Sequence, residues 1–162
     1  MTSTSFPAKG GCDCKAIRYR MSTAPMFVHC CHCRWCQRET GSAFVINALI
    51  EAERVEVVAG APAAIATPSH SGRGQTIYRC PTCQLALWSA YSIPTIRFVR
   101  VGTLDNPDLC PPDIHIFTSS KQPWFELPRG ALAFPEYYDS AQHWPAASLE
   151  RRAAALAASR GK

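Results

Sequence analysis

The spacing of the cysteines limits what this chain can fold into more than any other feature. Cys12 and Cys14 form a C-x-C pair near the start, and Cys80 and Cys83 form a C-x-x-C pair in the middle. Four thiolates arranged in two such pairs can enclose one zinc ion in a tetrahedral shell with no exchangeable position. We therefore expect a structural zinc site formed by these four cysteines. A disulfide pair or four unconnected buried thiols are the alternatives.

A second cysteine cluster follows a short apolar segment. Cys31, Cys33 and Cys36 form a C-x-C-x-x-C pattern that supplies three thiols to one cation and leaves its fourth tetrahedral position without an obvious neighbour. This pattern predicts an open, catalytic zinc site, and with it two Zn²⁺ ions per chain. The alternative is a second structural zinc completed by a neighbouring donor, for which the candidates are His29, Cys30, His32 and Cys110.

The residues beside this cluster differ in how they can reach the metal. His32 stands between two proposed ligands, so its ring should point away from the metal in an extended segment. His29 and Cys30 precede the cluster and are better placed to reach inward. Redox chemistry by the adjacent pair of Cys30 and Cys31 is a third option.

The length and apolar content of the chain favour one domain. With 162 residues, of which 47% are hydrophobic, it can bury one core. We expect a flexible lead-in over residues 1–9, a zinc domain over 10–139 and a helical tail over 140–162. Because no apolar run is long enough for a secretory signal or a membrane span, we expect a cytoplasmic protein without membrane association. In a reducing compartment, metal binding explains nine cysteines better than disulfides do.

The charge distribution gives little support for nucleic-acid binding. The net charge is +5, but three of these charges lie from Ser140 onward, in a tail that is otherwise rich in alanine. The body of the chain therefore carries only a small positive excess, which is weak support for a nucleic-acid surface. We expect a small-molecule substrate as the main partner.

Short alternating or apolar segments separated by turn residues predict a mainly β fold of antiparallel sheets. The expected strands cover residues 16–21, 26–28, 43–50, 54–59, 75–80, 85–90, 96–101 and 114–117. Gly10 and Gly11 are expected to curl the backbone through positive φ so that the first two sulfurs face one point. A surface loop is expected over residues 103–113.

Two helices are expected. The first covers residues 34–40 and ends at Gly41, which would bring Cys36 back toward Cys33. Ser148 should cap a final helix in which Leu149, Ala153 and Leu156 share one face, with Arg151 and Arg152 pointing elsewhere. This apolar face would pack on the body of the protein or on a partner subunit, so a homodimer is one option.

An open zinc ion held by three thiolates has a local charge of −1, which makes it a weaker Lewis acid than a zinc ion held by histidines. Such a site could gather a thiol substrate beside an aldehyde, or deliver hydroxide to a polarised C=O or C=N carbon. Either reaction needs a nearby cation or hydrogen-bond donor. The candidates for this role are Arg34, Arg38, Ser119 and Lys121.

Four motifs carry a family resemblance. In order along the chain they are GGCDC at 10–14, CHCRWCQR with GSAF at 31–44, CPTC at 80–83 and HIFTSSKQPW at 115–124. Together they resemble the glutathione-dependent formaldehyde-activating enzyme family, which includes centromere protein V. The chain departs from the family pattern at Gln84, where glycine is usual after the last zinc cysteine, and in the additional thiol of Cys30.

The resemblance implies an Mss4-like β-tent with one structural and one catalytic zinc, held by the cysteines proposed above. It also implies a carbon–sulfur lyase, named for the reaction that joins formaldehyde to glutathione as S-hydroxymethylglutathione. The proposed catalytic residues are Cys31, Cys33, Cys36 and Lys121. The alternatives are a zinc hydrolase that adds water to an imine or a related electrophile, and a non-enzymatic zinc-binding module. The sequence favours an enzyme, because the basic excess that a nucleic-acid module needs lies mostly in the tail.

Overall fold

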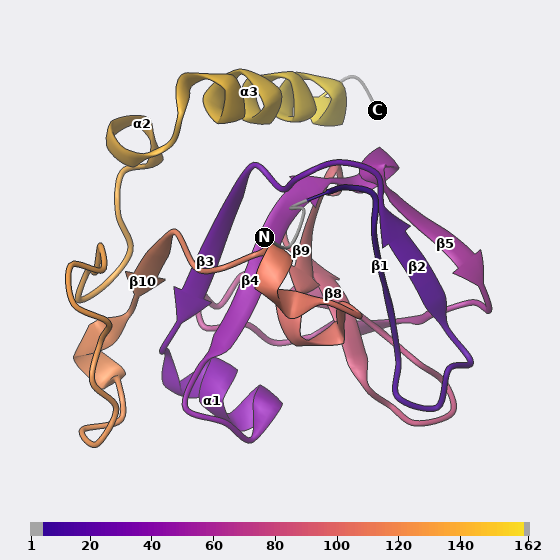
Figure 1. Ribbon diagram of the computed structural model, residues 1–162, viewed down its shortest axis with the longest axis horizontal. Helices are drawn as coiled ribbons and strands as arrows, with labels where there is room; N and C mark the ends of the chain where they lie inside the picture. Colours follow the sequence, from indigo (N-terminus) through magenta and orange to yellow (C-terminus); the bar gives the residue numbers. More distant parts are fainter. Residues whose placement is uncertain (1–4, 161–162) are drawn as a thin grey trace.

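The computed structural model describes residues 5–160, which form two β-sheets with helices at their ends (Figure 1). The smaller sheet has the strand order β1–β2–β5, with bounds Ala8–Gly11, Arg18–Met21 and Val55–Ala59. The larger sheet has the order β10–β3–β4–β9–β8–β7–β6, with bounds Ile114–Ile116, Phe27–Cys31, Val45–Glu51, Ile96–Arg100, Ala86–Ala90, Gln75–Arg79 and Ala63–Thr67. The helices are α1 Arg34–Thr40, α2 Ser140–His143 and α3 Ala146–Arg160, and short 3₁₀ turns cover Ala52–Arg54, Val101–Thr103, Pro107–Leu109 and Thr118–Ser120.

The pairing confirms the mainly β architecture expected from the sequence, and it agrees with an Mss4-like fold. All neighbouring strands are antiparallel except β10 and β3, which run parallel. Each strand expected from the sequence is present. Figure 1 shows α3 above the strands and α1 below them, with the smaller sheet to one side.

Strand β4 lies inside the larger sheet and separates two hydrophobic clusters. Because successive side chains of a strand point to opposite faces, Ala48 and Ile50 pack into the cluster shared with the smaller sheet. Val45 and Leu49 pack into the other cluster, which also contains the second cysteine group and residues of the C-terminal segment. The cysteine group thus lies on the face of the sheet that the C-terminal segment helps to cover.

The C-terminal helix differs from the expectation in its contacts. It begins at Ala146, and the Ser148 hydroxyl donates to the carbonyl of Met26 instead of capping the helix. Arg151 does not point away from the body: its guanidinium binds both carboxylate oxygens of Glu51, at 2.7 and 2.6 Å. Leu149 packs against the core as expected, but Ala153 is exposed and Ala155 is buried, so the buried face of the helix is rotated from the one expected.

Two strands were not expected from the sequence. β1 begins at Ala8, inside the segment expected as a lead-in, and pairs with β2, while residues 1–4 of that segment lie outside the described residues. β6 is rich in alanine and pairs with β7 at the edge of the larger sheet. Both strands lack an alternating apolar pattern, so the neighbouring strand determines their structure.

Gly10 and Gly11 serve a different purpose from the one expected. Both lie in β1, and the positive φ in this turn belongs to Lys15, at 63°. A Cβ atom on Gly10 would lie 2.6 Å from the Tyr19 ring, and one on Gly11 would lie 2.3 Å from the carbonyl oxygen of Ile17. The two glycines therefore permit close packing rather than a left-handed turn. Within residues 5–160, no helix is both long enough and apolar enough to span a membrane.

Candidate metal centres and active site

The first cysteine group brings together Cys12, Cys14, Cys80 and Cys83, with their four sulfur atoms within 4.8 Å of one another. The Sγ atoms of Cys12 and Cys14 are 3.5 Å apart, and those of Cys14 and Cys80 are 3.6 Å apart. A disulfide would need about 2.0 Å, whereas sulfurs that share a tetrahedral zinc lie about 3.8 Å apart. All nine cysteines are free thiols. The group therefore fits a metal ion with four protein ligands.

Two similar turns present these sulfurs. In the first turn the backbone N–H of Ile17 donates to Cys12 Sγ, and in the second the N–H of Cys83 donates to Cys80 Sγ. The residue after each pair, Lys15 or Gln84, has a positive φ of 63° or 62°. Gln84 thus adopts the left-handed conformation for which glycine is usual, and its side-chain amide donates to the carbonyl of Pro81 at 2.9 Å. The departure at Gln84 leaves the turn intact.

The second group contains Cys31, Cys33 and Cys36, all buried, with their sulfurs within 4.8 Å of one another. Cys31 ends β3, and Cys33 caps α1 by accepting the N–H of Cys36 at 3.3 Å. One helical turn then brings Cys36 Sγ within 3.5 Å of Cys31 Sγ. Gly41 ends α1 with a φ of 61°, as the sequence predicts. The end of a strand and the first turn of a helix therefore assemble the three ligands.

The three thiols of this group differ in their pKa values. Hydrogen bonds from the thiols of Cys31 and Cys36 lower the pKa of Cys33, while the same contact with Cys33 raises the pKa of Cys31. Cys33 is thus the thiol of the group whose surroundings most favour the thiolate form. Within residues 5–160, no fourth Cys, His, Asp or Glu joins these three sulfurs at ligand distance.

The three cysteines line a cavity of about 520 Å³. Most of its wall is aromatic or apolar, formed by Trp35, Tyr91, Phe98, Ile116, Phe117 and Tyr137. Its polar lining includes His29, Asn47, His70 and Arg73. A metal held by the three sulfurs would therefore have a cavity beside it that can hold a small substrate.

Phe117 holds a strained backbone conformation in this wall. Its φ of 56° and ψ of 41° lie in the left-handed region, which is rare for an aromatic residue. Its N–H donates to the carbonyl of Glu136, and its own carbonyl accepts from Ser120, so two turns fix it there. Such strain is concentrated at functional sites. The Phe117 ring also contacts the ring of His70 at 4.8 Å between centroids.

His29 lies in the cavity wall with a defined hydrogen-bonding role. Its Nε2 is 2.6 Å from the Tyr138 hydroxyl, and that hydroxyl accepts the indole N–H of Trp144, also at 2.6 Å. The indole can only donate, so the Tyr138 hydrogen is free to be given to His29 Nε2. Burial lowers the pKa of His29 to about 3, so the ring is neutral and carries its hydrogen on Nδ1. His29 is therefore arranged as a hydrogen-bond donor.

Asn47 provides a second donor in the cavity wall. Arg100, its neighbour in the register of β4 and β9, is 6% exposed and donates to Asn47 Oδ1 at 2.6 Å. Because this contact uses the amide oxygen, the amide N–H₂ is left to bind another group. The contact with Cys31 and, less strongly, the guanidinium of Arg100 lower the pKa of Cys36, but the contact with Cys33 and burial outweigh them and raise it to about 12. This buried cation suits a site whose metal carries three thiolates.

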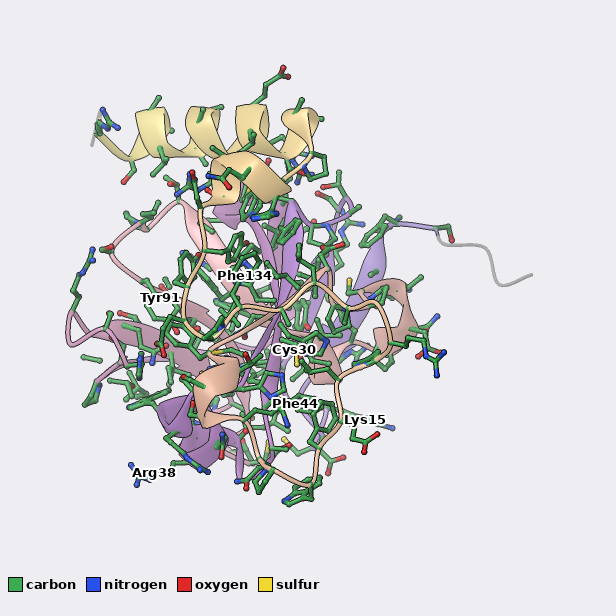
Figure 2. All side chains as sticks on the ribbon, turned by 90° about the vertical axis from the view of Figure 1, so that its left-hand side faces the viewer. Lys15, Cys30, Arg38, Phe44, Tyr91 and Phe134 are labelled. Atoms are coloured by element: carbon green, nitrogen blue, oxygen red, sulfur yellow. The ribbon has the colours of Figure 1, made fainter. Side chains whose placement is uncertain are left out.

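The proposed helpers lie outside this cavity. Ser119 donates to Glu136, and the Lys121 ammonium donates to the carbonyls of Gln122 and Phe125. Arg34 and Arg38 line a separate, open groove of about 990 Å³ beside Trp124, and Figure 2 shows Arg38 pointing outward. The structure does not bring these four residues to the cysteine group, and a catalytic role for Lys121 stays a prediction.

The candidates for a fourth ligand separate into three places. His29 lines the cavity without joining the three sulfurs, while Cys110 is buried in the other hydrophobic cluster. Cys30 and His32 meet His115 in a third group of possible ligands. The expectation that His32 points away from Cys31 and Cys33 is therefore correct.

Among the polar residues at or beside the cavity, the sequence reasoning missed Asn47, His70, Arg73, Arg100 and Tyr138. Asn47 gave a signal, because it interrupts an apolar strand at a position that should be buried. Arg100 and Tyr138 gave none, since each acts through a partner that lies far away along the chain.

A match to a known protein family agrees with the two cysteine groups. A family model described as "Glutathione-dependent formaldehyde-activating enzyme" matches residues 7–120, a range that contains all seven cysteines of the two groups. A crystal structure of a Rhodobacter sphaeroides protein is similar, with 23% sequence identity and a TM-score of 0.46, covering 62% of this chain and 92% of that chain. No curated protein matches the chain.

Proposed function

The chain belongs to the glutathione-dependent formaldehyde-activating enzyme family, and on this premise we propose that it is a zinc-dependent enzyme of the carbon–sulfur lyase type. The proposed substrate is the adduct of a thiol, with glutathione as the candidate, and a small aldehyde such as formaldehyde. In the lyase direction the carbon–sulfur bond breaks with its electrons remaining on sulfur, and the hydroxyl loses its proton as the carbonyl forms.

One observation supports this proposal above the others: Cys31, Cys33 and Cys36 open into a cavity instead of being enclosed by a fourth protein ligand. When bound there, zinc would supply a soft, thiophilic Lewis acid able to accept a substrate thiolate or polarise an oxygen. The Cys12 group would hold a second zinc that has no free position and serves the fold.

The residues of the cavity wall can stabilise the substrate oxygen. In the direction of addition, negative charge builds on the aldehyde oxygen as the thiolate attacks its carbon. The ring N–H of neutral His29 and the amide of Asn47 are the donors available to that oxygen, and both are held in position by buried partners. The low polarity of the aromatic wall strengthens these hydrogen bonds. Arg73 is the cation of the lining that can pair with a carboxylate of the thiol.

Lys121 is the remaining proposed catalytic residue. It would have to release the carbonyls of Gln122 and Phe125 to act in the cavity. The 115–124 motif that contains Lys121 also helps to position the cysteine group. Its Ser120 hydroxyl donates to the carbonyl of His32, between Cys31 and Cys33, and the Gln37 amide of α1 donates to the same carbonyl.

The shape of the cavity favours a second candidate function. Most of the wall of this space of about 520 Å³ is aromatic or apolar, which would suit an apolar electrophile larger than formaldehyde. The alternative is therefore a hydrolase that adds water to an imine or related C=N or C=O carbon.

One experiment tests the proposal and separates the two functions. The zinc-loaded protein is assayed for exchange between glutathione, formaldehyde and S-hydroxymethylglutathione by NMR, and for hydrolysis of aryl imines without thiol. We expect exchange that depends on glutathione and is lost in Cys33→Ser, with Cys110→Ser as a control for loss of a buried thiol. An exchange rate no different from that without protein would contradict the lyase function, and imine hydrolysis without thiol would establish the alternative.

A further inference from the structure

A third group of possible metal ligands lies on the opposite face of β3 from the cavity. Because side chains alternate along a strand, His29 and Cys31 face the cavity and Cys30 faces the other way. His115 in β10 is the register partner of Cys30, so the two side chains lie next to each other on that face. Cys30 is labelled in the interior of the molecule in Figure 2. The chain then turns at His32, whose ring reaches back to the same point.

The donor atoms of these three side chains lie close together. Nε2 of His32 is 3.6 Å from Cys30 Sγ and 2.9 Å from His115 Nδ1. Three ligands around one metal with ordinary bond lengths lie about 3.7 Å apart for sulfur and nitrogen and about 3.5 Å apart for two nitrogens. The first separation already fits a metal, and the second needs only a small opening of the two rings.

All three residues are buried, with exposed fractions of 1% for Cys30, 0% for His32 and 5% for His115. Both polar contacts of the His32 ring come from Nε2, and its Nδ1 is buried with no hydrogen-bond partner among the described residues. The ring packs against those of Phe44 and Phe125, with centroids at 5.3 and 5.5 Å. Cys30 Sγ, His32 Nε2 and His115 Nδ1 therefore face one another at one point inside the protein.

We propose that Cys30, His32 and His115 form a third metal site, separate from the two zinc centres, that binds a soft monovalent cation, Cu⁺. On binding, the Cys30 thiol loses its proton to solvent and its sulfur bonds to the metal. Each imidazole keeps one hydrogen, on His32 Nδ1 and His115 Nε2, and gives its other nitrogen to the metal. One proton is thus released for each ion bound, and no group is oxidised or reduced.

Two features favour Cu⁺ over Zn²⁺ at this site. The first is ligand number, because three donors suit Cu⁺, whereas zinc needs a fourth ligand that this buried group does not supply. The second is charge. One thiolate with two neutral imidazoles makes the Cu⁺ site neutral, whereas Zn²⁺ would leave a buried net charge of +1. The Lys121 ammonium acts on His32 as a nearby positive charge, which makes an additional buried charge still less favourable.

The test uses zinc-loaded full-length protein under anaerobic conditions. One equivalent of Cu⁺ is added as its acetonitrile complex, the protein is desalted, and both metals are measured by mass spectrometry. We expect two zinc ions and one copper ion per chain in the wild type and in the control Cys110→Ala, which removes a buried thiol outside all three groups. Cys30→Ala and His115→Ala should keep two zinc ions and lose at least nine-tenths of the copper.

Copper X-ray absorption of the wild type provides a second measurement that does not depend on any variant folding. One sulfur and two nitrogen ligands are expected. Copper with a shell of sulfur alone and an equal loss of zinc would overturn the proposal, because the ion would then occupy a zinc centre. Copper retained by both Cys30→Ala and His115→Ala would overturn it as well. Cys30→Ser and His115→Gln, which retain hydrogen bonding, replace the alanine variants if those do not fold.

Discussion

The hydroxyl of Tyr138 joins His29 to Trp144, with 2.6 Å from its oxygen to each ring nitrogen. His29 belongs to β3, whereas Tyr138 and Trp144 lie in the segment leading into α3. The C-terminal part of the chain thus fixes which nitrogen of a cavity-wall histidine carries the hydrogen. This arrangement connects the packing of the tail with the chemistry of the proposed active site.

Replacing Tyr138 with phenylalanine should test that connection. Tyr138→Phe removes the donor to His29 Nε2, so the neutral ring loses its preference for hydrogen on Nδ1. We expect kcat to fall by about tenfold with little change in KM, and nitrogen NMR of the His29 ring to show a mixture of tautomers. Stability should fall by about 1–3 kcal/mol, because a buried indole N–H loses its acceptor. Tyr78→Phe, remote from the cavity lining, is the control, and an unchanged tautomer in Tyr138→Phe would contradict the assignment.

Glu51 and Arg151 should control the docking of α3. Glu51 is 4% exposed and is bound by Arg151. Burial, the largest single effect, would raise its pKa, but the hydrogen bonds from Arg151 and the backbone, together with the charges of Arg151 and Arg54, outweigh burial, and the pKa lies below its ordinary value. Arg151→Met leaves this carboxylate buried without its main partner, and we expect the free energy of unfolding at pH 7 to fall by about 3 kcal/mol.

The same pair gives a pH dependence with a defined sign. Because the pKa of Glu51 is lowered on folding, the pair stabilises the protein above the ordinary carboxyl pKa and loses this effect as the pH falls through the folded value. The difference between wild type and Arg151→Met, measured by urea unfolding, should therefore shrink below about pH 4. Arg152→Met, which removes only a contact over the Trp144 ring, is the matched control. A difference that stays constant from pH 7 to pH 3 would show that the pair is not the cause.

Local patterns in the sequence were sufficient for eight of the ten strands within residues 5–160, for α1 with its stop at Gly41, and for the two cysteine groups. In each case the determining residues are close together or repeat with a fixed period. Contacts between segments that are distant in sequence could not be predicted from local patterns. The pairing of β10 with β3, the approach of Arg151 to Glu51 and the bond from Ser148 to Met26 all depend on how separate elements pack. The sequence predicts that Arg151 points away from the body of the protein, because its buried partner Glu51 lies 100 positions away along the chain and leaves no local signal.

Gln84 offers a test of how the Cys80 turn tolerates a residue other than glycine. Its φ of 62° costs roughly 1–2 kcal/mol for a residue with a Cβ atom, and its bond to Pro81 offsets part of this. Gln84→Gly removes the strain but increases the freedom of the unfolded chain, so we expect a gain of about 0.5 kcal/mol. Gln84→Ala keeps the strain and loses the hydrogen bond, and should destabilise by about 1 kcal/mol. Both are measured by urea unfolding of the zinc-loaded protein, and a destabilising Gln84→Gly would show that the side-chain bond dominates.

The two cysteine groups should differ in what their loss does to the fold. Cys12→Ser breaks the group that joins two turns distant in sequence, and since a structural zinc can contribute on the order of 10 kcal/mol, we expect an unfolded or aggregated protein. Cys33→Ser should retain a cooperative thermal transition and lose one of two zinc ions. Calorimetry with zinc analysis of each variant measures both effects. Equal unfolding of the two variants would show that both metals are structural.

Asn47→Asp tests the catalytic role of the Asn47 amide without removing the hydrogen bond that Asn47 accepts from Arg100. Aspartate can still accept the hydrogen bond from Arg100, so the buried guanidinium keeps its partner and the thermal midpoint should change little. It has no N–H to offer the substrate, and its negative charge would repel the charge that builds on the aldehyde oxygen. Since removal of one such donor typically reduces turnover by 100-fold or more, we expect kcat to fall by about 100-fold with zinc content unchanged. Full activity in Asn47→Asp would mean that the amide does not face the substrate, and His29 would then be the remaining donor of the pair.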